Sequence, residues 1–228
     1  MKRINGNLIF ERNPHIASFA SAVGKKEGEG PLGKYFDRVI RDSYVGKDTF
    51  EQAESALLST AVRVALNKGD FEASDIDIAC CGDLLNQCVA SSFAMRQYGI
   101  PYVGLYGACS TMGLAMIVAA TALECGAADR AVCAASSHYC TAERQYRFPL
   151  EYGSQRPPTA QWTVTGSGAC VLDVSKQSED SSCPNPHISA ARIGKICDYN
   201  ITDQNNMGAA MAPAVVKLGT FLYFSIKA

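Results

Sequence analysis

The segment from Cys109 to Cys125 constrains the fold more than any other part of the sequence, because almost every residue in it is apolar. A helix that is apolar all round has no face to turn toward water, so it must be buried on all sides. The residues that leave no polar face are Met112, Leu114, Ala115, Met116, Ile117, Val118, Ala119, Ala120 and Leu123. The sequence therefore predicts a helix inside the protein, ended by Gly126.

The segments around this helix alternate between strand and helix patterns. The predicted elements are strands at Pro14–Val23, Ile76–Cys81, Tyr102–Tyr106, Ala131–Ser137, Trp162–Val164 and Ala169–Val174, and helices at Asp48–Lys68, Asn86–Gln97 and Cys109–Cys125, with a loop at Gly24–Gly33. Asp48 and Glu51 form a capping-box pattern, and Gly69 ends that helix. The β-α-β-α-β-α-β-β order is typical of the α/β class. The run 131–137 does not alternate, which is typical of a parallel strand covered on both faces.

The chain changes character after residue 174. Ser175–Pro186 is polar and predicts a linker, Ile188–Tyr199 predicts a strand, and Asn206–Lys217 predicts a helix. The apolar run Leu218–Ile226 has two interpretations, a last core strand or a chain that is cut or shifted out of frame. Its poor fit to the local pattern leads us to expect the second.

Charge and cysteine placement exclude several classes of protein. The net charge is -1, so the chain lacks the basic face that a nucleic-acid binder needs. We expect no signal peptide and no transmembrane segment, because no apolar run approaches the length of a membrane span. Ten cysteines without a Cys-x-x-Cys pair, and three distant histidines, give no zinc spacing, and we expect no metal or other cofactor. Most cysteines lie in apolar runs and are expected to be buried, with Cys109 as the exception.

Cys109 carries the strongest local signal for chemistry. Gly107 permits a tight turn between a predicted strand and the apolar helix, which places Cys109 at the N-terminus of that helix. Unpaired backbone amides and the helix dipole favour an anion there. The thiol can then be a nucleophile with a lowered pKa, or the turn can hold a ligand carboxylate. A third interpretation is a small residue needed where a helix enters the core.

Long contiguous strings of the sequence agree with one known family. They are Gly82–Gln87, Gly107–Met112, Ser136–Tyr152, Gln155–Gly166 and Asn205–Ala214. These strings resemble the stage V sporulation protein AD family, a thiolase-fold family of endospore-forming bacteria. The resemblance runs from about residue 7 to about residue 216.

The resemblance implies a thiolase-like fold with two similar halves, each of β-α-β-α-β-α-β-β type, in which two helices pack between two sheets. Residues 1–185 would then form a complete N-terminal half, and residues 186–228 the start of a second half that is truncated. The apolar helix would lose one of its packing surfaces, so we expect Met112, Met116 and Leu123 to be partly exposed. The chain would then be marginally stable or aggregate.

The resemblance also implies a function. The family binds pyridine-2,6-dicarboxylic acid (dipicolinic acid) and takes part in its movement into the developing spore, with membrane proteins of the same operon as partners. The expected location is peripheral, on the cytoplasmic side of the forespore or spore inner membrane. Dimerisation through an edge strand is expected from the thiolase-like fold.

Dipicolinate is a flat dianion, so its site needs cations or amide donors for two carboxylates and an apolar slot for the ring. The carboxyl ends of parallel strands form such a crevice. The candidate ligand-binding residues at that edge are Asn86, Cys109, Ser137, His138 and Arg144, with Arg147 and Arg156 as further cations. Structural roles stay open for several of them: Asn86 as a helix cap, His138 as a cap or core hydrogen-bonding residue, and the arginines in ion pairs.

The alternative is a thiolase- or ketoacyl-synthase-like acyltransferase in which Cys109 is the catalytic nucleophile and forms a thioester. The resemblance equates Cys109 with the reactive cysteine of those enzymes. They also need histidines, and often a second cysteine, from their C-terminal half, and no residues here match them. His187 lies in the predicted linker without a matching motif. We therefore expect a binding protein rather than an enzyme. A fragment without activity is a third hypothesis.

Overall fold

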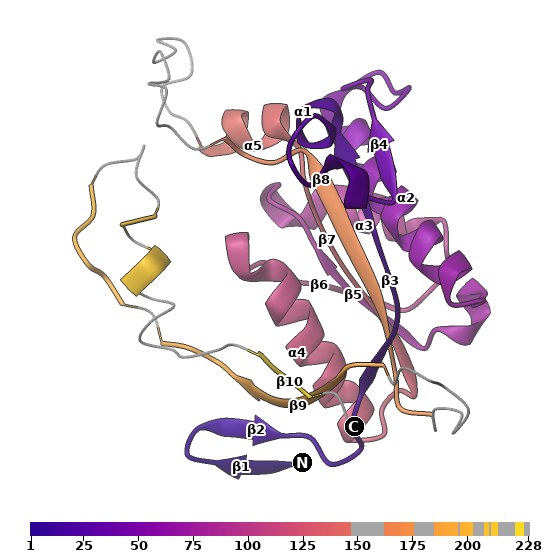
Figure 1. Ribbon diagram of the computed structural model, residues 1–228, viewed down its shortest axis with the longest axis vertical. Coiled ribbons are helices and arrows are strands. Elements are labelled where there is room, and N and C mark those ends of the chain that lie inside the picture. The colour runs from indigo at the N-terminus through magenta and orange to yellow at the C-terminus, as the bar shows by residue number, and fades with distance from the viewer. Residues whose placement is uncertain are drawn as a thin grey trace.

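A mixed β-sheet forms the centre of the protein in the computed structural model (Figure 1). The structure describes residues 1–146, 162–175, 185–195, 197–202, 208–209, 211–213 and 222–225. The strands are β1 (Lys2–Ile4), β2 (Asn7–Ile9), β3 (His15–Gly24), β4 (Arg38–Ile40), β5 (Ile78–Gly82), β6 (Tyr102–Gly104), β7 (Arg130–Ser137), β8 (Gly166–Asp173), β9 (His187–Arg192) and β10 (Leu222–Ser225). Their order in the sheet is β1-β2-β9-β3-β8-β7-β5-β6, with β4 beside β3 and β10 beside β9.

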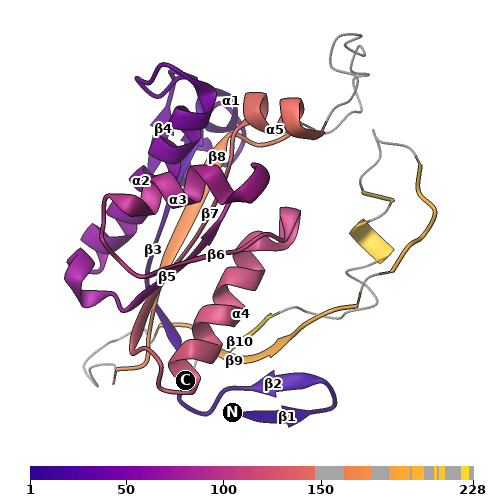
Figure 2. The ribbon, with the colours of Figure 1, turned by 180° about the vertical axis from the view of Figure 1, so that it is seen from behind.

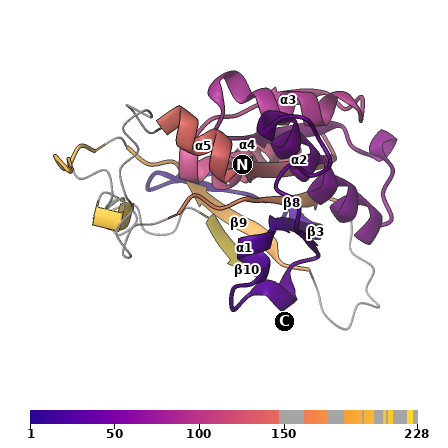
Figure 3. The same cartoon turned by 90° about the horizontal axis from the view of Figure 1, so that it is seen from above.

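Helices cover both faces of this sheet. On one face, α2 (Phe50–Lys68) packs beside α3 (Val89–Arg96), and α4 (Thr111–Glu124) covers the other face (Figure 2). Two shorter helices, α1 (Lys25–Gly28) and α5 (Tyr139–Tyr146), lie at one end of the sheet, the end nearest the viewer in Figure 3.

Strand β7 shows why the central strands are apolar without interruption. Val132 and Ala134 pack in the cluster under α2, whereas Ala131 and Cys133 pack in the cluster under α4. Both faces are therefore covered, as the sequence predicts. The expected parallel pairing holds on one side only, because β7 is parallel to β5 and antiparallel to β8.

The predicted order of elements is confirmed from β3 to β8, with additions. Strands β1, β2 and β4 and helix α5 were not predicted, and the predicted loop 24–33 contains α1. The predicted strand pair around Gly166 is wrong, because β8 is one strand that pairs with β3 on one side and β7 on the other. Gly168 faces Ser21 and Ala135 across the two ladders, so it is a strand residue and not part of a turn.

The N-terminus of α2 is capped one residue later than predicted. Thr49 Oγ1 accepts the backbone N–H of Gln52 at 3.3 Å, and the side chain of Gln52 accepts the N–H of Asp48 at 3.3 Å. The predicted capping box of Asp48 and Glu51 is therefore wrong. Glu51 instead forms an ion pair with Arg144 of α5. Gly69 follows the helix as its C-cap residue, as predicted.

Helix α4 has the predicted apolar composition, but two of its side chains are more deeply buried than expected. Met116 and Leu123 are 7% and 0% exposed. The expectation that both are partly exposed is wrong, because they belong to the cluster packed between α4 and the sheet. Met112 is half-buried, as are Leu114 and Val118.

The C-terminal part of the chain returns to the same sheet. The predicted strand 188–199 is shorter and forms β9, which pairs with β2 and β10. Within the apolar run 218–226, residues 222–225 form β10, which agrees with the interpretation of this run as a strand. Residues 176–184 of the predicted linker and most of the predicted helix 206–217 lie outside the described residues. The division into two halves at residue 185 stays a prediction.

Candidate functional site

Three parallel strands bring most of the predicted site residues to one edge of the sheet. Strand β5 is parallel to β6 and to β7, so all three end at the same edge. Asn86 follows β5, Cys109 follows β6, and β7 ends at Ser137, which His138 follows. This edge is the part of an α/β sheet where ligands bind.

Cys109 is exposed in a tight turn, a 3-10 helix at Ala108–Ser110, just before α4. Ala108 adopts a left-handed conformation with φ of 47°, which costs an L-residue free energy. A Cβ at Gly107 would lie 2.7 Å from Ser110 Oγ, so a larger residue would displace that hydroxyl. Ser110 Oγ donates to Gly107 O at 2.7 Å, and no side chain caps α4. The thiol therefore lies at a helix N-terminus without a side-chain cap, where the N–H groups of Ser110 and Thr111 are already bonded to Gly107 O and Ala108 O.

His138 is buried, and both of its ring nitrogens are hydrogen-bonded. Nδ1 accepts the backbone N–H of Cys140 at 3.2 Å, and Nε2 lies 2.8 Å from Ser43 O. Because Nδ1 accepts, the ring proton is on Nε2 and is donated to Ser43. Burial lowers the pKa of His138 below its ordinary value, although the bond to Ser43 opposes this effect. These contacts describe a neutral imidazole that ties β7 to the loop at Ser43.

Ser137 and Asn86 differ in their surroundings. Ser137 Oγ donates to Val164 O at 2.6 Å, so this hydroxyl joins β7 to the segment before β8. Asn86 is exposed. The N-cap of α3 is Cys88, so the capping role that the sequence left open for Asn86 is not observed.

Arg144 lies on α5 and is half-exposed. Its guanidinium forms an ion pair with Glu51 at the start of α2. The ion-pair role left open by the sequence is therefore observed for Arg144. Arg147 and Arg156 lie outside the described residues.

A buried carboxylate, Asp83, shapes the edge next to Asn86 and was not singled out from the sequence. Asp83 accepts the N–H of Leu85 at 2.9 Å, and the N–H and hydroxyl of Ser91 at 2.6 Å each. The Ser91 hydroxyl also lies 2.9 Å from the Tyr102 hydroxyl. Between these anchors Gln87 and Cys88 adopt left-handed conformations. The available signal was an acidic residue directly after an apolar strand.

A second buried acid, Glu54, lies on the sheet-facing side of α2. It accepts hydrogen bonds from Ser136 Oγ at 3.1 Å and from Thr141 Oγ1 at 2.6 Å. Burial raises the pKa of Glu54 to about 7, and the charge of Asp83 adds to this, while the two hydroxyl bonds oppose it. The sequence signal was a charged residue at a position of the helix that faces the core.

A cavity of about 450 Å³ lies at the end of the sheet where α1 and α5 meet. Of the five predicted ligand-binding residues, His138 lines this cavity, and Asn86, Cys109, Ser137 and Arg144 do not. The structure thus brings the predicted residues to one edge without gathering them around one cavity. Their roles in ligand binding stay predictions.

Several cysteines are where the sequence places them. Cys80, Cys81, Cys133 and Cys170 are buried free thiols, as expected of small apolar residues. Cys109 is exposed, but so are Cys125 and Cys197, so the expectation of burial is wrong for these two. Within the described parts of the chain, no three His, Cys, Asp or Glu side chains are grouped so that they could hold a metal ion.

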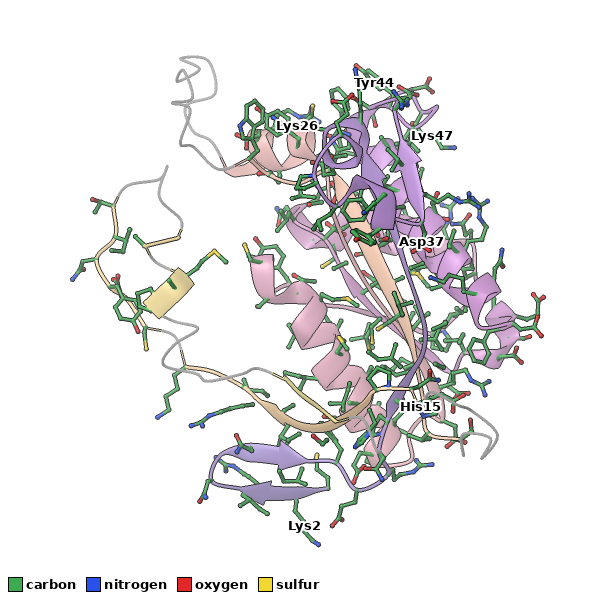
Figure 4. All side chains as sticks on the ribbon, in the orientation of Figure 1. Lys2, His15, Lys26, Asp37, Tyr44 and Lys47 are labelled. Atoms are coloured by element: carbon green, nitrogen blue, oxygen red, sulfur yellow. The ribbon has the colours of Figure 1, made fainter. Side chains whose placement is uncertain are left out.

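The two other histidines lie far from Cys109. His15 faces His187 across β3 and β9, and faces Asp173 across β3 and β8. This is the end of the sheet opposite to α1 and α5, as the positions of His15 and Lys26 show in Figure 4. Of the three histidines, His138 therefore lies at the Cys109 edge.

Comparisons with known proteins identify a family for this chain. The family described as "Stage V sporulation protein AD" matches residues 5–223. A curated protein of that name from Bacillus subtilis (strain 168) is 44% identical over 207 residues, which is 90% of this chain. The chain spans 59% of the length of that relative.

Solved structures share the fold at low sequence identity. A crystal structure of 3-oxoacyl-[acyl-carrier-protein] synthase III from Aquifex aeolicus VF5 is 16% identical, with a TM-score of 0.53 over 80% of this chain and 58% of that chain. A crystal structure of an OleA variant from Xanthomonas campestris bound with cerulenin is 18% identical, with a TM-score of 0.62 over 92% of this chain and 70% of that chain. These likenesses establish a thiolase-like α/β fold.

Proposed function

The chain belongs to the stage V sporulation protein AD family, and on this premise we propose that it is a dipicolinic acid-binding component of the uptake system that loads dipicolinate into the developing endospore. The observation that supports this function best is the exposed Cys109 at the uncapped start of α4. The positive end of the helix dipole attracts a carboxylate at such a position.

Each predicted residue has a different part in this site. Cys109 and the exposed Asn86 amide are available to contact the ligand directly. Ser137 and His138 already hold Val164 and Ser43, so they keep the edge rigid. Arg144 can supply a cation for a carboxylate after it leaves Glu51, because an ion pair between half-exposed side chains is worth only about 0–1 kcal/mol.

The membrane-associated part of the function depends on partners. In the parts of the chain that the structure describes, the helices are too short or too polar to cross a bilayer. From its family we infer that the protein acts peripherally on the cytoplasmic side of the forespore or spore inner membrane, held by membrane proteins of the same operon. Strand β6 lies at an edge of the described sheet and is the strand through which a homodimer would form.

A thermal-shift titration with dipicolinate tests the site. A ligand that binds the folded state raises the apparent stability, so dipicolinate should raise the Tm of the wild-type chain. Cys109→Ala should lose this shift. Cys125→Ala is the matched control, because Cys125 is also exposed but lies at the other end of α4. Equal shifts in both variants would contradict the assigned site, and no shift in the wild type would contradict the function.

A second function has one specific observation in its favour. The exposed Cys109 follows a strained Ala108 at a strand-to-helix turn, which is how nucleophile elbows present a reactive group. In acyl transfer, the Cys109 sulfur would attack the thioester carbonyl of an acyl-CoA, form a new thioester and release CoA as its thiol. Incubation with acetyl-CoA, followed by mass spectrometry of the peptide that contains Cys109, tests this. An acetyl adduct would support the enzyme, and an unmodified peptide would support the binding protein.

A further inference from the structure

The cavity at the end of the sheet has features that the proposed dipicolinate site does not use. It lies between α1, the loop after β4, the start of α5 and residues 162–165. Its volume of about 450 Å³ falls within the range of about 300–1,000 Å³ that small-molecule sites occupy. Cys109 does not line it. His138 is the residue of the proposed dipicolinate site that also lines this cavity, and both of its ring nitrogens are already hydrogen-bonded.

Glu27 lines this cavity, and its two carboxylate oxygens differ in their contacts. Its Oε1 accepts the backbone N–H of Thr165 at 3.1 Å. Its Oε2 is buried and has no hydrogen-bond partner among the described residues. Buried polar atoms in native proteins are almost always paired, so an unpaired carboxylate oxygen points to a group that binds there.

Another part of the cavity wall is aromatic. The rings of Tyr139 and Trp162 are stacked with centroids 5.1 Å apart. The ammonium of Lys26 lies 3.3 Å from the centroid of the Trp162 ring. The indole face therefore already holds a cation, and a ligand ammonium at this face would replace that of Lys26.

The charges around the cavity favour a cation over an anion. Lys25 and Glu29 are 4.0 Å apart and neutralise each other, and Lys26 lies over the indole. The Asp42 carboxylate accepts the backbone N–H groups of Tyr44 and Gly46 at 3.0 and 2.8 Å. The described lining carries three acidic side chains, Glu27, Glu29 and Asp42, against two lysines, so its net charge is negative.

We propose that this cavity binds a small organic cation, with its ammonium or guanidinium group on the Glu27 carboxylate and its apolar part against Trp162 and Tyr139. The inference does not rest on the proposed dipicolinate function, and it concerns different residues. The recognised chemistry is a charged nitrogen on an apolar stem, which a free amine or a lysine side chain of a partner protein could supply.

Fluorescence of Trp162 tests this directly, because it is the single tryptophan of the chain. The probe is 2-phenylethylammonium, and 3-phenylpropionate serves as a probe of similar shape and opposite charge. We expect a saturable change in fluorescence with the ammonium and none with the carboxylate. A capped lysine, N-acetyl-lysine methylamide, identifies the source: comparable affinity indicates a partner's side chain, and weaker binding indicates a free amine.

Matched variants distinguish the carboxylate from a general charge effect. Glu27→Gln keeps the acceptor for Thr165 and removes the charge, so it should weaken the ammonium probe by about 10–100-fold. Glu29→Gln makes the same charge change at an exposed residue of the same segment, and its effect should stay within about fivefold. Lys26→Met should tighten binding, because it removes the ammonium that competes for the indole.

Two results would overturn the proposal. One is that the carboxylate probe or dipicolinate binds at Trp162 and is weakened by Lys26→Met, which would make the cavity an anion site. The other is that no probe gives a saturable change, or that Glu27→Gln binds as tightly as the wild type. Dipicolinate binding at Cys109 could survive either result, because it is measured with Cys109→Ala.

Discussion

Helices α2 and α4 cover opposite faces of the same sheet, but their N-termini are built differently. Side chains close the start of α2: Thr49 caps it, and Glu51 and Glu54 attach it to α5. Helix α4 has no side-chain cap and begins after a left-handed Ala108 with the exposed Cys109 beside it. Helix ends carry unsatisfied N–H groups that side chains, water or ligands must satisfy. Side chains therefore close the start of α2, whereas backbone bonds of a 3-10 turn lead into α4.

The two helices also bury acids with opposite properties. Glu54 on α2 meets two hydroxyl groups, and burial raises its pKa to about 7. Burial likewise raises the pKa of Glu124 on α4, but the Met1 ammonium at 2.7 Å and the N–H groups of Glu11 and Arg12 outweigh this effect, so the net pKa is below the ordinary value. Burial alone therefore does not decide the charge of an acid, because the donors around it can reverse the effect.

The largest expected effect concerns packing. Leu57 of α2 is fully buried, whereas Leu114 of α4 is half-buried. Leu57→Ala should lower the free energy of unfolding by about 2–5 kcal/mol, because it removes buried methyl groups and leaves a cavity. Leu114→Ala should cost less than half as much, because that side chain is already partly in water. Urea unfolding measures both, and equal losses would mean that the outer face of α4 is packed as tightly as α2.

The second effect is a dependence of stability on pH. Glu54 has a folded pKa of about 7 and an ordinary value of 4.5, so the folded state keeps a proton that the unfolded state loses. Stability from this group is complete below pH 4.5 and falls as pH rises to 7, by about 3 kcal/mol in total. Glu54→Gln should remove this fall, which urea unfolding at pH 5 and pH 8 can measure.

The Glu54→Gln variant must be compared with the wild type at each pH, because other groups also change the stability between pH 5 and pH 8. Burial lowers the pKa values of His15 and His138, and these groups make stability rise with pH. Glu124→Gln is the control of opposite sign: its lowered pKa stabilises the fold above about pH 4.5, and this contribution is lost as pH falls. If Glu54→Gln and wild type have the same slope between pH 5 and pH 8, Glu54 is ionised in the folded state.

Periodicity predicted the sheet and its helices because burial on two faces requires long apolar runs, as in β7 and α4. Periodicity failed where hydrogen bonding between strands decides the structure. The Gly-Ser-Gly string at 166–168 has the composition of a turn, but ladders on both sides keep it extended. The hairpin of β1 and β2 and the short helix α5 are too brief to show a period.

Local features of the candidate site could be predicted from the sequence, but its long-range contacts could not. The turn at Gly107 and the thiol at the start of α4 follow from local sequence, and Cys109 is exposed there. The partners of His138 and Arg144 do not follow, because Ser43 and Glu51 come from segments about 90 residues away in the chain. The sequence places Glu54 in a predicted helix, but it does not predict the contacts of Glu54 with Ser136 and Thr141. These residues are distant in the chain, and the fold brings them near.

The third effect is local strain at the start of α4. Ala108 has φ of 47°, a region that glycine adopts without the steric cost of a Cβ. Ala108→Gly should therefore raise the free energy of unfolding by about 0.5–1 kcal/mol. Ala122→Gly, inside the regular part of α4, should lower it by about 1 kcal/mol. A loss of stability in both variants would show that the turn before Cys109 is not strained.

The smallest effect concerns the exposed link between α2 and α5. Glu51 and Arg144 are 40% and 50% exposed, so a double-mutant cycle with Glu51→Ala and Arg144→Ala should give a coupling of only about 0.5 kcal/mol, which added salt weakens. Thr141→Val keeps the shape of the side chain but removes the buried hydrogen bond to Glu54, and should cost about 1–3 kcal/mol. The buried bond would then be the one that seats α5 on α2. A coupling of the surface pair larger than the cost of Thr141→Val would reverse this order, and the closed start of α2 would depend on its surface charges.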